Sequence, residues 1–318
     1  MSSDIESVIL EALRIHNHEI SFCQLSETAY STIYTEQMKK QGWRPIADAT
    51  KGHSILAKDT IYALKHKNEI VATLSSAKSP AFKVAYMGFF TVNKEWRGLQ
   101  LGQYLWKKVV GLLNNDGYMI EFDAPQALQN YYENLGYKIA TTGTIHVLKK
   151  LDQLDNIIDS GRVQEITQEN IAKVVEYDYS IIPNDNREEY LTTWINKKYT
   201  NAVCYVNNDT VIGYGVMSKH VGDNKNNTYS YILAPIYAQT SEIACEIIKH
   251  LCIKANTDEP IYLDTLNYNP LASALMKALG FDEQMSFNRM SETGILDKKR
   301  TEIISQVYAL SSHGYAPL

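Results

Sequence analysis

The sequence lacks the patterns that indicate a metal site, a redox site or a nucleophilic enzyme. Only four of its 318 residues are cysteines, and none forms a CxxC pair or a cysteine–histidine set with metal-ligand spacing. Neither a GxSxG motif nor a catalytic cysteine–histidine arrangement is evident. We therefore expect no bound metal and no covalent enzyme intermediate.

Long apolar runs and basic clusters are also missing. No stretch approaches the length that a membrane-spanning helix needs. The first residues carry Asp4, Glu6 and Glu11, where a secretory signal would need a basic end and an apolar run. The formal net charge of -5 argues against a nucleic-acid partner. These absences predict a cytoplasmic protein without membrane or nucleic-acid partners; an effector delivered by a dedicated bacterial secretion system is the alternative.

Composition and length indicate two ordinary globular domains. Hydrophobic residues make up 45% of the chain and charged residues 21%, which allows a buried core in each half. Single hydrophobic cores stop growing at roughly 250–300 residues, so a chain of this length is expected to divide. We expect the boundary near residue 155, in the polar segment 149–162, with domains at 1–150 and 151–318.

Apolar patterns recur in the same order in the two halves. Each half is predicted to hold an opening strand and helix, further strands, a long helix, a strand, a shorter helix and a final strand. The expected strands are 19–25, 60–65, 70–77, 84–92, 119–123 and 139–147, then 162–166, 202–206, 210–217, 229–234, 261–266 and 286–290. The expected helices are 28–40, 101–114 and 126–135, then 169–180, 187–197, 241–252 and 270–279. Segment 132–137 (YENLGY) matches segment 276–281 (MKALGF) at the same place in each half, which indicates a duplicated unit.

The segment 92–102 (VNKEWRGLQLG) lies between an expected strand and an expected helix. Free backbone N–H groups at a helix start bind a pyrophosphate, and glycine lets the backbone approach it closely. The segment resembles the acyl-CoA-binding signature of the GNAT superfamily, except that Gln100 stands where the first glycine of the RxxGxG core usually lies. The resemblance implies acetyl-CoA as cosubstrate. The residues that it implies for binding are Phe90, Thr91, Val92, Arg97, Gly98, Leu99, Gln100, Leu101, Gly102, Gln103 and Tyr132.

Tyr132 lies in segment 130–137 (NYYENLGY), which looks like the helix end that carries the catalytic tyrosine of GNAT enzymes. The resemblance implies that Tyr132 protonates the departing thiolate. A phenol with a pKa near 10 suits a leaving thiol with a pKa near 8.5. The alternative is an aromatic side chain that only packs under the next strand.

An amine acceptor must lose a proton before or during its attack, because an alkylamine is almost fully protonated at neutral pH. Glu121 and Asp123 lie two residues apart on one expected strand and therefore face the same side. We expect one of them to be the general base, with Asp123 as first choice. The alternative is that Asp123 only caps the following helix.

Gly42, Trp43 and Pro45, followed by Asp48 and Ala49, resemble the GW-P element of a bacterial tandem-GNAT subfamily. The element is expected either in the acceptor pocket or as an apolar plug of a helix-to-loop turn. The resemblance continues in the second half and covers nearly the whole chain. The segments that carry it there are 232–238, 269–281 and 287–290, with Asp264.

The second copy lacks both functional signatures. Segment 234–240 (APIYAQT) contains no glycine and includes Pro235, which has no N–H to donate. Met276 stands where Tyr132 lies in the first copy. We therefore expect the second copy to shape the acceptor site rather than to bind acetyl-CoA.

Together these features predict an α/β (α+β) protein of two tandem GNAT folds, each with a mixed, mostly antiparallel central sheet flanked by helices. The expected activity is transfer of an acetyl group from acetyl-CoA to a primary amine by direct attack. The acceptor stays open between a small amine, a peptide and a protein, including a host protein, and the chain is either a monomer or a homodimer. The alternative function is a catalytically decayed tandem that binds CoA or a partner protein.

Overall fold

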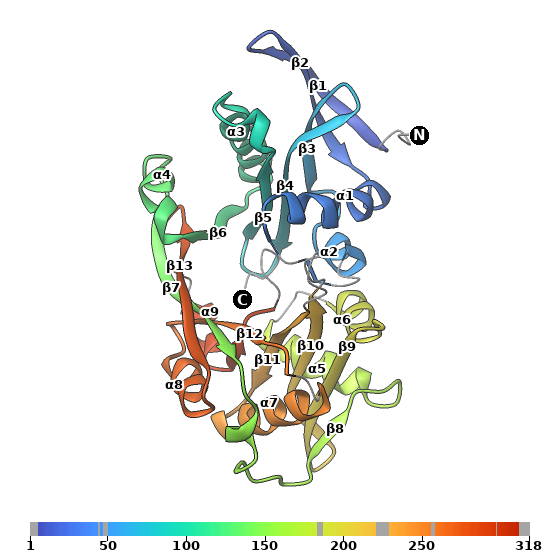
Figure 1. Cartoon of the computed structure of the whole chain (residues 1–318), viewed down its shortest axis with the longest axis vertical. Coiled ribbons are helices and arrows are strands. Elements are labelled where there is room, and N and C mark those ends of the chain that lie inside the picture. Colours follow the sequence, from blue (N-terminus) through green and yellow to red (C-terminus); the bar gives the residue numbers. More distant parts are fainter. Residues whose placement is uncertain are drawn as a thin grey trace.

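The computed structural model describes residues 6–43, 45–46, 50–182, 187–220, 229–255, 258–296 and 298–311, arranged in two lobes along the longest axis (Figure 1). The first half holds β1 (Ser7–Ile15), β2 (His18–Leu25), α1 (Glu27–Lys40), α2 (Thr50–Leu56), β3 (Ile61–His66), β4 (Glu69–Ser79), β5 (Val84–Val92), α3 (Leu101–Asn115), β6 (Met119–Pro125), α4 (Gln129–Glu133) and β7 (Lys138–Leu148). The second half holds β8 (Val163–Glu165), α5 (Ile171–Ile181), α6 (Glu188–Ile195), β9 (Thr200–Asn207), β10 (Thr210–His220), β11 (Ser230–Ala238), α7 (Ser241–Ala255), β12 (Ile261–Leu266), α8 (Pro270–Ala278), β13 (Asp282–Ser291), α9 (Lys298–Ile304) and β14 (Val307–Ala309).

The strands of the described part form one continuous sheet. Their order is β1-β2-β3-β4-β5-β6-β13-β7-β12-β11-β10-β9-β8, and β14 pairs with β11. Neighbours are antiparallel except for the pairs β5–β6 and β11–β12. This confirms the predicted fold class, a mixed and mostly antiparallel sheet flanked by helices.

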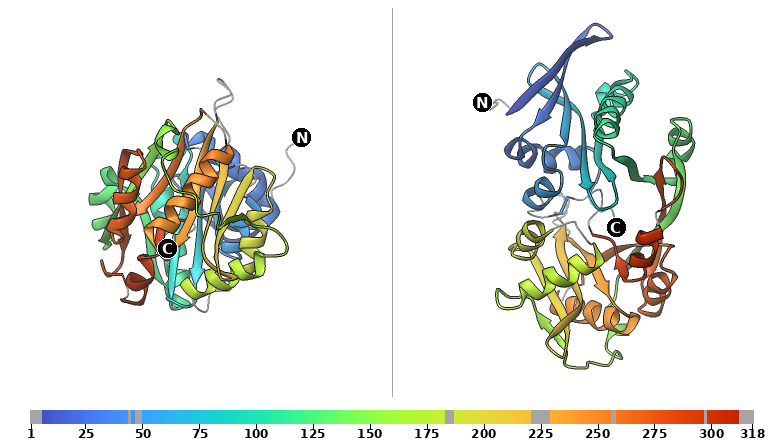
Figure 2. Two further views of the ribbon diagram at one scale, coloured as in Figure 1. Left: turned by 90° about the horizontal axis from the view of Figure 1, so that it is seen from below. Right: turned by 180° about the vertical axis from the view of Figure 1, so that it is seen from behind.

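The two halves exchange strands in the middle of the sheet. β13 of the second half lies between β6 and β7 of the first half, while β7 pairs with β12 on its other side. β7 and β13 run side by side between the lobes in both the front and the rear view (Figures 1 and 2). The division at 1–150 and 151–318 stays a prediction. In space, β7 of the first half pairs with β12 of the second, and β13 of the second half pairs with β6 of the first.

The helices pack where their apolar residues recur with helical spacing. α3 buries Leu105, Trp106 and Val109 against the first-half strands. A second contact joins the two halves, because Trp194 of α6 is fully buried beside α2. A Cβ on Gly52 would lie 2.9 Å from the Trp194 ring, so glycine permits this close approach.

The predicted repeat is visible in matching turns. In the first half, the N–H of Tyr137 donates to the carbonyl of Tyr132 over 3.1 Å; in the second half, that of Phe281 donates to Met276 over 3.0 Å. The glycine before each donor has a positive φ. The same turn therefore leads from α4 into β7 and from α8 into β13, as a duplicated unit requires.

Candidate active site

β5 and β6 pair along only part of their length. Val84, Ala85 and Tyr86 pair with Met119, Ile120 and Glu121. Beyond these pairs the two strands diverge, as Figure 1 shows, and β6 continues along β13 instead. We call the diverging lengths, 87–92 of β5 and 122–125 of β6, the first splay. Within the described part of the chain, no strand pairs with this edge of β5.

A bulge bends β5 inside the first splay. Phe89 has a φ of 50°, and the pairing with β4 shifts register between Thr73 and Ser75. The Thr73 hydroxyl donates to the Phe89 carbonyl over 3.0 Å, and the Ser75 hydroxyl donates to the Gly88 carbonyl over 3.2 Å. These hydroxyls hold the bulge from the β4 side. A bulge changes the direction in which the following backbone groups point, and is common beside active sites.

The loop between β5 and α3 presents a row of free backbone donors. Gly98 has a φ of 82°, and Gln100 has φ 60° and ψ 10°, which is the left-handed region. None of the six N–H groups from Gly98 to Gln103 has a hydrogen-bond partner among the residues that the structure describes. They lead into a helix of 15 residues with no acidic side chain in its first turn. Free donors and the positive end of the helix dipole together suit an anion.

Gly102 lets the start of α3 lie directly on β5. A Cβ at this position would be 3.0 Å from Val92 Cγ2 and 3.2 Å from Phe90 Cζ. A side chain at this position would therefore need Val92, Phe90 or the helix start to shift. The structure thus brings Phe90, Val92 and Gly102, three members of the predicted cofactor-binding set, together. A fourth member, Thr91, has its hydroxyl 2.6 Å from that of Thr73.

Arg97 fastens the loop to two other elements. Its Nη2 donates to Gln41 Oε1 over 2.5 Å, at the end of α1, and its Nε donates to the Val92 carbonyl over 3.1 Å. The side chain is otherwise exposed, so part of the guanidinium stays open to a ligand. The N-terminal end of α3 is thus tied to both β5 and α1.

Tyr132 lies on α4, close to the first splay, in a cluster of aromatic side chains. Its ring centroid is 4.5 Å from that of Phe122 and 5.4 Å from that of Trp106. Burial, with a smaller effect from Tyr131, raises the pKa of Tyr132 well above its usual value. The hydroxyl makes no hydrogen bond with the part of the chain that the structure describes. A protonated, unengaged phenol fits a general acid, while the packing also fits the alternative of a core aromatic, so the assignment stays a prediction.

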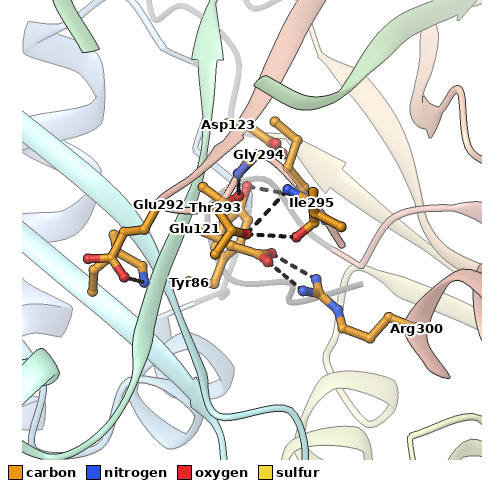
Figure 3. Close-up of polar contacts among 11 residues, drawn as sticks. Tyr86, Glu121, Asp123, Glu292, Thr293, Gly294, Ile295 and Arg300 are labelled. Atoms are coloured by element: carbon orange, nitrogen blue, oxygen red, sulfur yellow. Dashed lines mark hydrogen bonds and ion pairs between the residues drawn. The ribbon is translucent and has the colours of Figure 1, made fainter. Parts of the chain in front are cut away.

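The two candidate bases both bind arginines of the second half. Glu121 accepts two hydrogen bonds from Arg300 of α9, at 2.5 and 2.8 Å (Figure 3). Asp123 accepts two from Arg289 of β13, both at 2.9 Å. Asp123 does not cap the following helical turn, because Pro125 occupies the cap position and makes no side-chain cap bond. Sequence reasoning missed both arginines, since no local pattern links them to β6.

The corresponding place in the second half is filled by the chain itself. β11 and β12 pair only at Tyr231 and Ile232 before they separate, and β14 then pairs with β11. The Leu310 N–H donates to the Asp264 carbonyl of β12 over 3.0 Å, so this segment contacts both strands. We call the lengths of β11 and β12 beyond the pair Ile232–Tyr262, where these strands separate, the second splay. The Tyr308 hydroxyl lies 3.1 Å from that of Ser241, the first residue of α7, and so covers the end that would face an anion.

The GW-P element is described only in part, because Arg44, Asp48 and Ala49 lie outside the described residues. Gly42 has a φ of 74°, and the Trp43 N–H donates to the Met38 carbonyl, which ends α1. Trp43 is 44% exposed, whereas Pro45 is buried, so only the proline fits the alternative of an apolar plug. Its place in an acceptor pocket stays a prediction.

Comparison with known proteins bears on both halves. A model of the acetyltransferase (GNAT) family matches residues 21–137, and a model of the acetyltransferase (GNAT) domain matches residues 174–305. The chain is a tandem GNAT protein. No curated protein sequence gives a significant match.

Solved structures share the whole tandem arrangement. A Pyrococcus horikoshii protein named as an acetyltransferase has a TM-score of 0.69 at 15% identity, over 93% of this chain and 96% of that one. A tandem GNAT protein from the clavulanic acid biosynthesis pathway has a TM-score of 0.62 at 12% identity, over 86% and 98%. Saccharomyces cerevisiae N-myristoyltransferase has a TM-score of 0.65 at 12% identity, over 98% and 92%. At such identities the similarity establishes the fold.

The described residues also bear on membrane and metal partners. None of the helices there is long and apolar enough to cross a membrane. No group of three or more histidine, cysteine, aspartate or glutamate side chains in that part of the chain could hold a metal ion.

Proposed function

We propose that this tandem GNAT protein transfers an acetyl group from acetyl-CoA to a primary amine, and that it has one cofactor site, at the first splay. The observation that carries the proposal is the row of free N–H groups from Gly98 to Gln103 at the start of α3. These donors would hold the pyrophosphate, and the contact of Gly102 with β5 keeps them in place. The unpaired edge of β5 offers further backbone donors and acceptors to an extended amide chain.

When bound, acetyl-CoA supplies a thioester whose acetyl group is activated toward an amine. In our proposal the amine nitrogen bonds to the acetyl carbon as the carbon–sulfur bond breaks. Tyr132 donates its proton to the departing sulfur and is reprotonated by solvent. The position of Tyr132 supports this role, because its ring lies 4.5 Å from that of Phe122 in the first splay and its hydroxyl makes no hydrogen bond within the described part of the chain.

We propose Asp123, rather than Glu121, as the group that takes the proton lost by the amine. Both carboxylates are bound by an arginine, but the Asp123 side chain is 19% exposed whereas that of Glu121 is 3% exposed. A base must come within hydrogen-bond reach of the amine, directly or through one water. Asp123 also lies beyond the last β5–β6 pair, within the first splay, whereas Glu121 is part of that pair.

The first test counts acetyl-CoA sites and then removes the acid. Calorimetry on the full chain is expected to give one site. Tyr132→Phe is expected to lower turnover about 100-fold, because general acids contribute roughly 10²–10⁴-fold, and to leave acetyl-CoA affinity nearly unchanged. Turnover is measured as thiol release with ethylamine, glycinamide, spermidine and a lysine-containing peptide as probe acceptors.

Tyr131→Phe is the matched control, since Tyr131 is the neighbour of Tyr132 on α4 and is 42% exposed. It is expected to behave as wild type. Equal turnover of wild type and Tyr132→Phe would remove Tyr132 as the acid. Binding of acetyl-CoA without turnover of any probe would favour the alternative function, a CoA-binding module.

A further inference from the structure

β13 brings second-half side chains to the first splay. It pairs antiparallel with β6, and in this register Arg289 lies directly opposite Asp123. Directly opposed residues in an antiparallel pair have their side chains on the same face and close together. The contact of these two residues therefore follows from the strand exchange itself.

The contact fixes the Asp123 carboxylate in one plane. Arg289 Nε and Nη2 donate to Oδ1 and Oδ2, each over 2.9 Å. The guanidinium also lies 4.9 Å from the centroid of the Tyr86 ring, and the Arg289 side chain is fully buried. Burial, and next the charge of Asp123, raise the pKa of Tyr86 well above its usual value, so this neighbour stays neutral. A two-point contact by a buried, planar group leaves the carboxylate little freedom to turn.

Both members of the pair can form further hydrogen bonds: the Asp123 oxygens as acceptors and Arg289 Nη1 as a donor. Each carboxylate oxygen can accept two hydrogen bonds, and Arg289 supplies one to each. Arg289 Nη1 is buried and has no partner among the residues that the structure describes.

Glu121 and Arg300 form a comparable ion pair on the same strand, just outside the first splay. This pair also joins β6 to the second half through two hydrogen bonds, as the dashed lines between Glu121 and Arg300 in Figure 3 show. Its side chains are only 3% and 1% exposed. The two pairs are thus alike in geometry, but only the carboxylate of Asp123 is open to a substrate.

We infer that Arg289 is a positioning residue for Asp123, so that the second half completes the proton-accepting side of the active site in the first half. The inference rests on the proposed function, in which Asp123 is the base. The second half then takes part in catalysis through β13, although its own splay is filled by β14.

The test is a double-mutant cycle on the full chain, with thiol release from acetyl-CoA measured with glycinamide and with water as acceptors. Arg289→Met is expected to lower kcat about 10- to 100-fold with the KM for acetyl-CoA within twofold of wild type. Arg289→Lys keeps the charge but loses the two-point contact, and is expected to recover part of the rate. Asp123→Asn combined with Arg289→Met is expected to be no slower than Asp123→Asn alone, because Arg289 acts through Asp123.

Arg300→Met is the matched control, since it removes the other ion pair between β6 and the second half. It is expected to lower the melting temperature as much as Arg289→Met, but to keep kcat per folded molecule within threefold of wild type. If Arg289→Met does not fold, Arg289→Lys tests the inference in its place, with an expected loss of about 3- to 10-fold in kcat.

The inference is overturned if the folded Arg289 variants keep the wild-type kcat. It is also overturned if the kcat losses of Asp123→Asn and Arg289→Met multiply in the double variant, or if Arg300→Met lowers kcat as much as Arg289→Met does. In these cases the proposed function stands, because turnover itself is retained. Absence of turnover with all four probe amines in a wild-type chain that binds acetyl-CoA would instead overturn the proposed function and the inference with it.

Discussion

In each half, two strands start as a parallel pair and then separate: β5 and β6 in the first half, β11 and β12 in the second. In the first splay, no strand of the described part pairs with the edge of β5, and the adjoining helix begins with free N–H groups. In the second splay, β14 pairs with β11, and Tyr308 covers the start of α7. The same fold therefore leaves the edge of β5 unpaired within the described part of the chain, whereas β14 pairs with the corresponding edge of β11.

The difference shows how a copy can lose a site and keep its fold. An unpaired strand edge is unfavourable when buried, so it needs either a ligand or a segment of protein. In the second half, the Asn269 side chain donates to the carbonyls of Ser305 and Val307 and holds the filling segment in place. Met276 is fully buried where the first copy has Tyr132. In our proposal, the second half thus contributes through β13, which pairs with β6, rather than through its own splay.

The largest expected effect comes from making the first splay unable to receive a ligand. Gly102→Trp must displace Val92 or Phe90, whose atoms lie 3.0 and 3.2 Å from a Cβ at this position. The start of α3 would move off β5, and acetyl-CoA affinity is expected to fall at least 100-fold, about 2.7 kcal/mol. Calorimetry on the full chain measures this.

The control for Gly102→Trp is Gly111→Trp, on the same helix, where a Cβ would meet nothing within 4 Å. It is expected to bind acetyl-CoA as wild type does. Unchanged affinity in Gly102→Trp would place the cofactor away from the first splay and remove the contrast between the two halves.

A smaller effect is expected at the second contact between the two halves, where α2 packs against α6. His53 of α2 is buried with its ring 5.6 Å from that of Trp194 on α6. Burial, and next the charge of Lys197, lower the pKa of His53 well below its usual value. In the unfolded chain the group takes up a proton near pH 6.5, while in the folded chain it stays neutral, so stability falls as pH drops below 6.5.

The measurement is the free energy of unfolding of wild type and His53→Gln between pH 7 and pH 5. The wild-type value, relative to the variant, is expected to fall by about 1–2 kcal/mol over this range, at no more than about 1.4 kcal/mol per pH unit. His146 is also buried with a lowered pKa, but it is present in both proteins and cancels. Parallel pH curves would show that His53 takes up a proton in the folded chain at the same pH as in the unfolded chain.

Local sequence patterns predicted most of the elements and the cofactor loop. Strand alternation and helical spacing act over a few residues, and Gly98 and Gly102 occupy positions where a positive φ or a close approach is needed. The helix expected at 126–135 is a short 3-10 turn followed by α4. β1, α2, α9 and β14 were not predicted; in β1, three consecutive exposed apolar residues, Val8, Ile9 and Leu10, do not follow the alternation of a half-buried strand.

The strand exchange and the partners of the candidate bases could not be predicted in this way. Arg289 is 166 residues from Asp123, and Arg300 is 179 residues from Glu121. Which strand lies beside β6 depends on the packing of the whole chain rather than on any local preference. The sequence could therefore nominate two carboxylates on one face of a strand, while only the structure distinguishes the open Asp123 from the closed Glu121.

The smallest effect separates two explanations of Gln100, the residue that departs from the glycine pattern. Its φ of 60° is unfavourable for a residue with a Cβ, so Gln100→Gly is expected to raise the free energy of unfolding by about 0.5–1 kcal/mol.

If the loop binds phosphate through its backbone, this variant keeps or gains acetyl-CoA affinity. Gln100→Ala keeps the Cβ but loses the amide, and then binds as wild type without the gain in stability. If instead the amide of Gln100 donates to phosphate, both variants lose affinity, and this loop differs from a glycine-type cradle because its side chain replaces a contact that the backbone would make. The two variants, measured by calorimetry and thermal unfolding, thus show whether the first splay binds its ligand through the backbone at the start of α3, the helix end that Tyr308 covers at α7 in the second half.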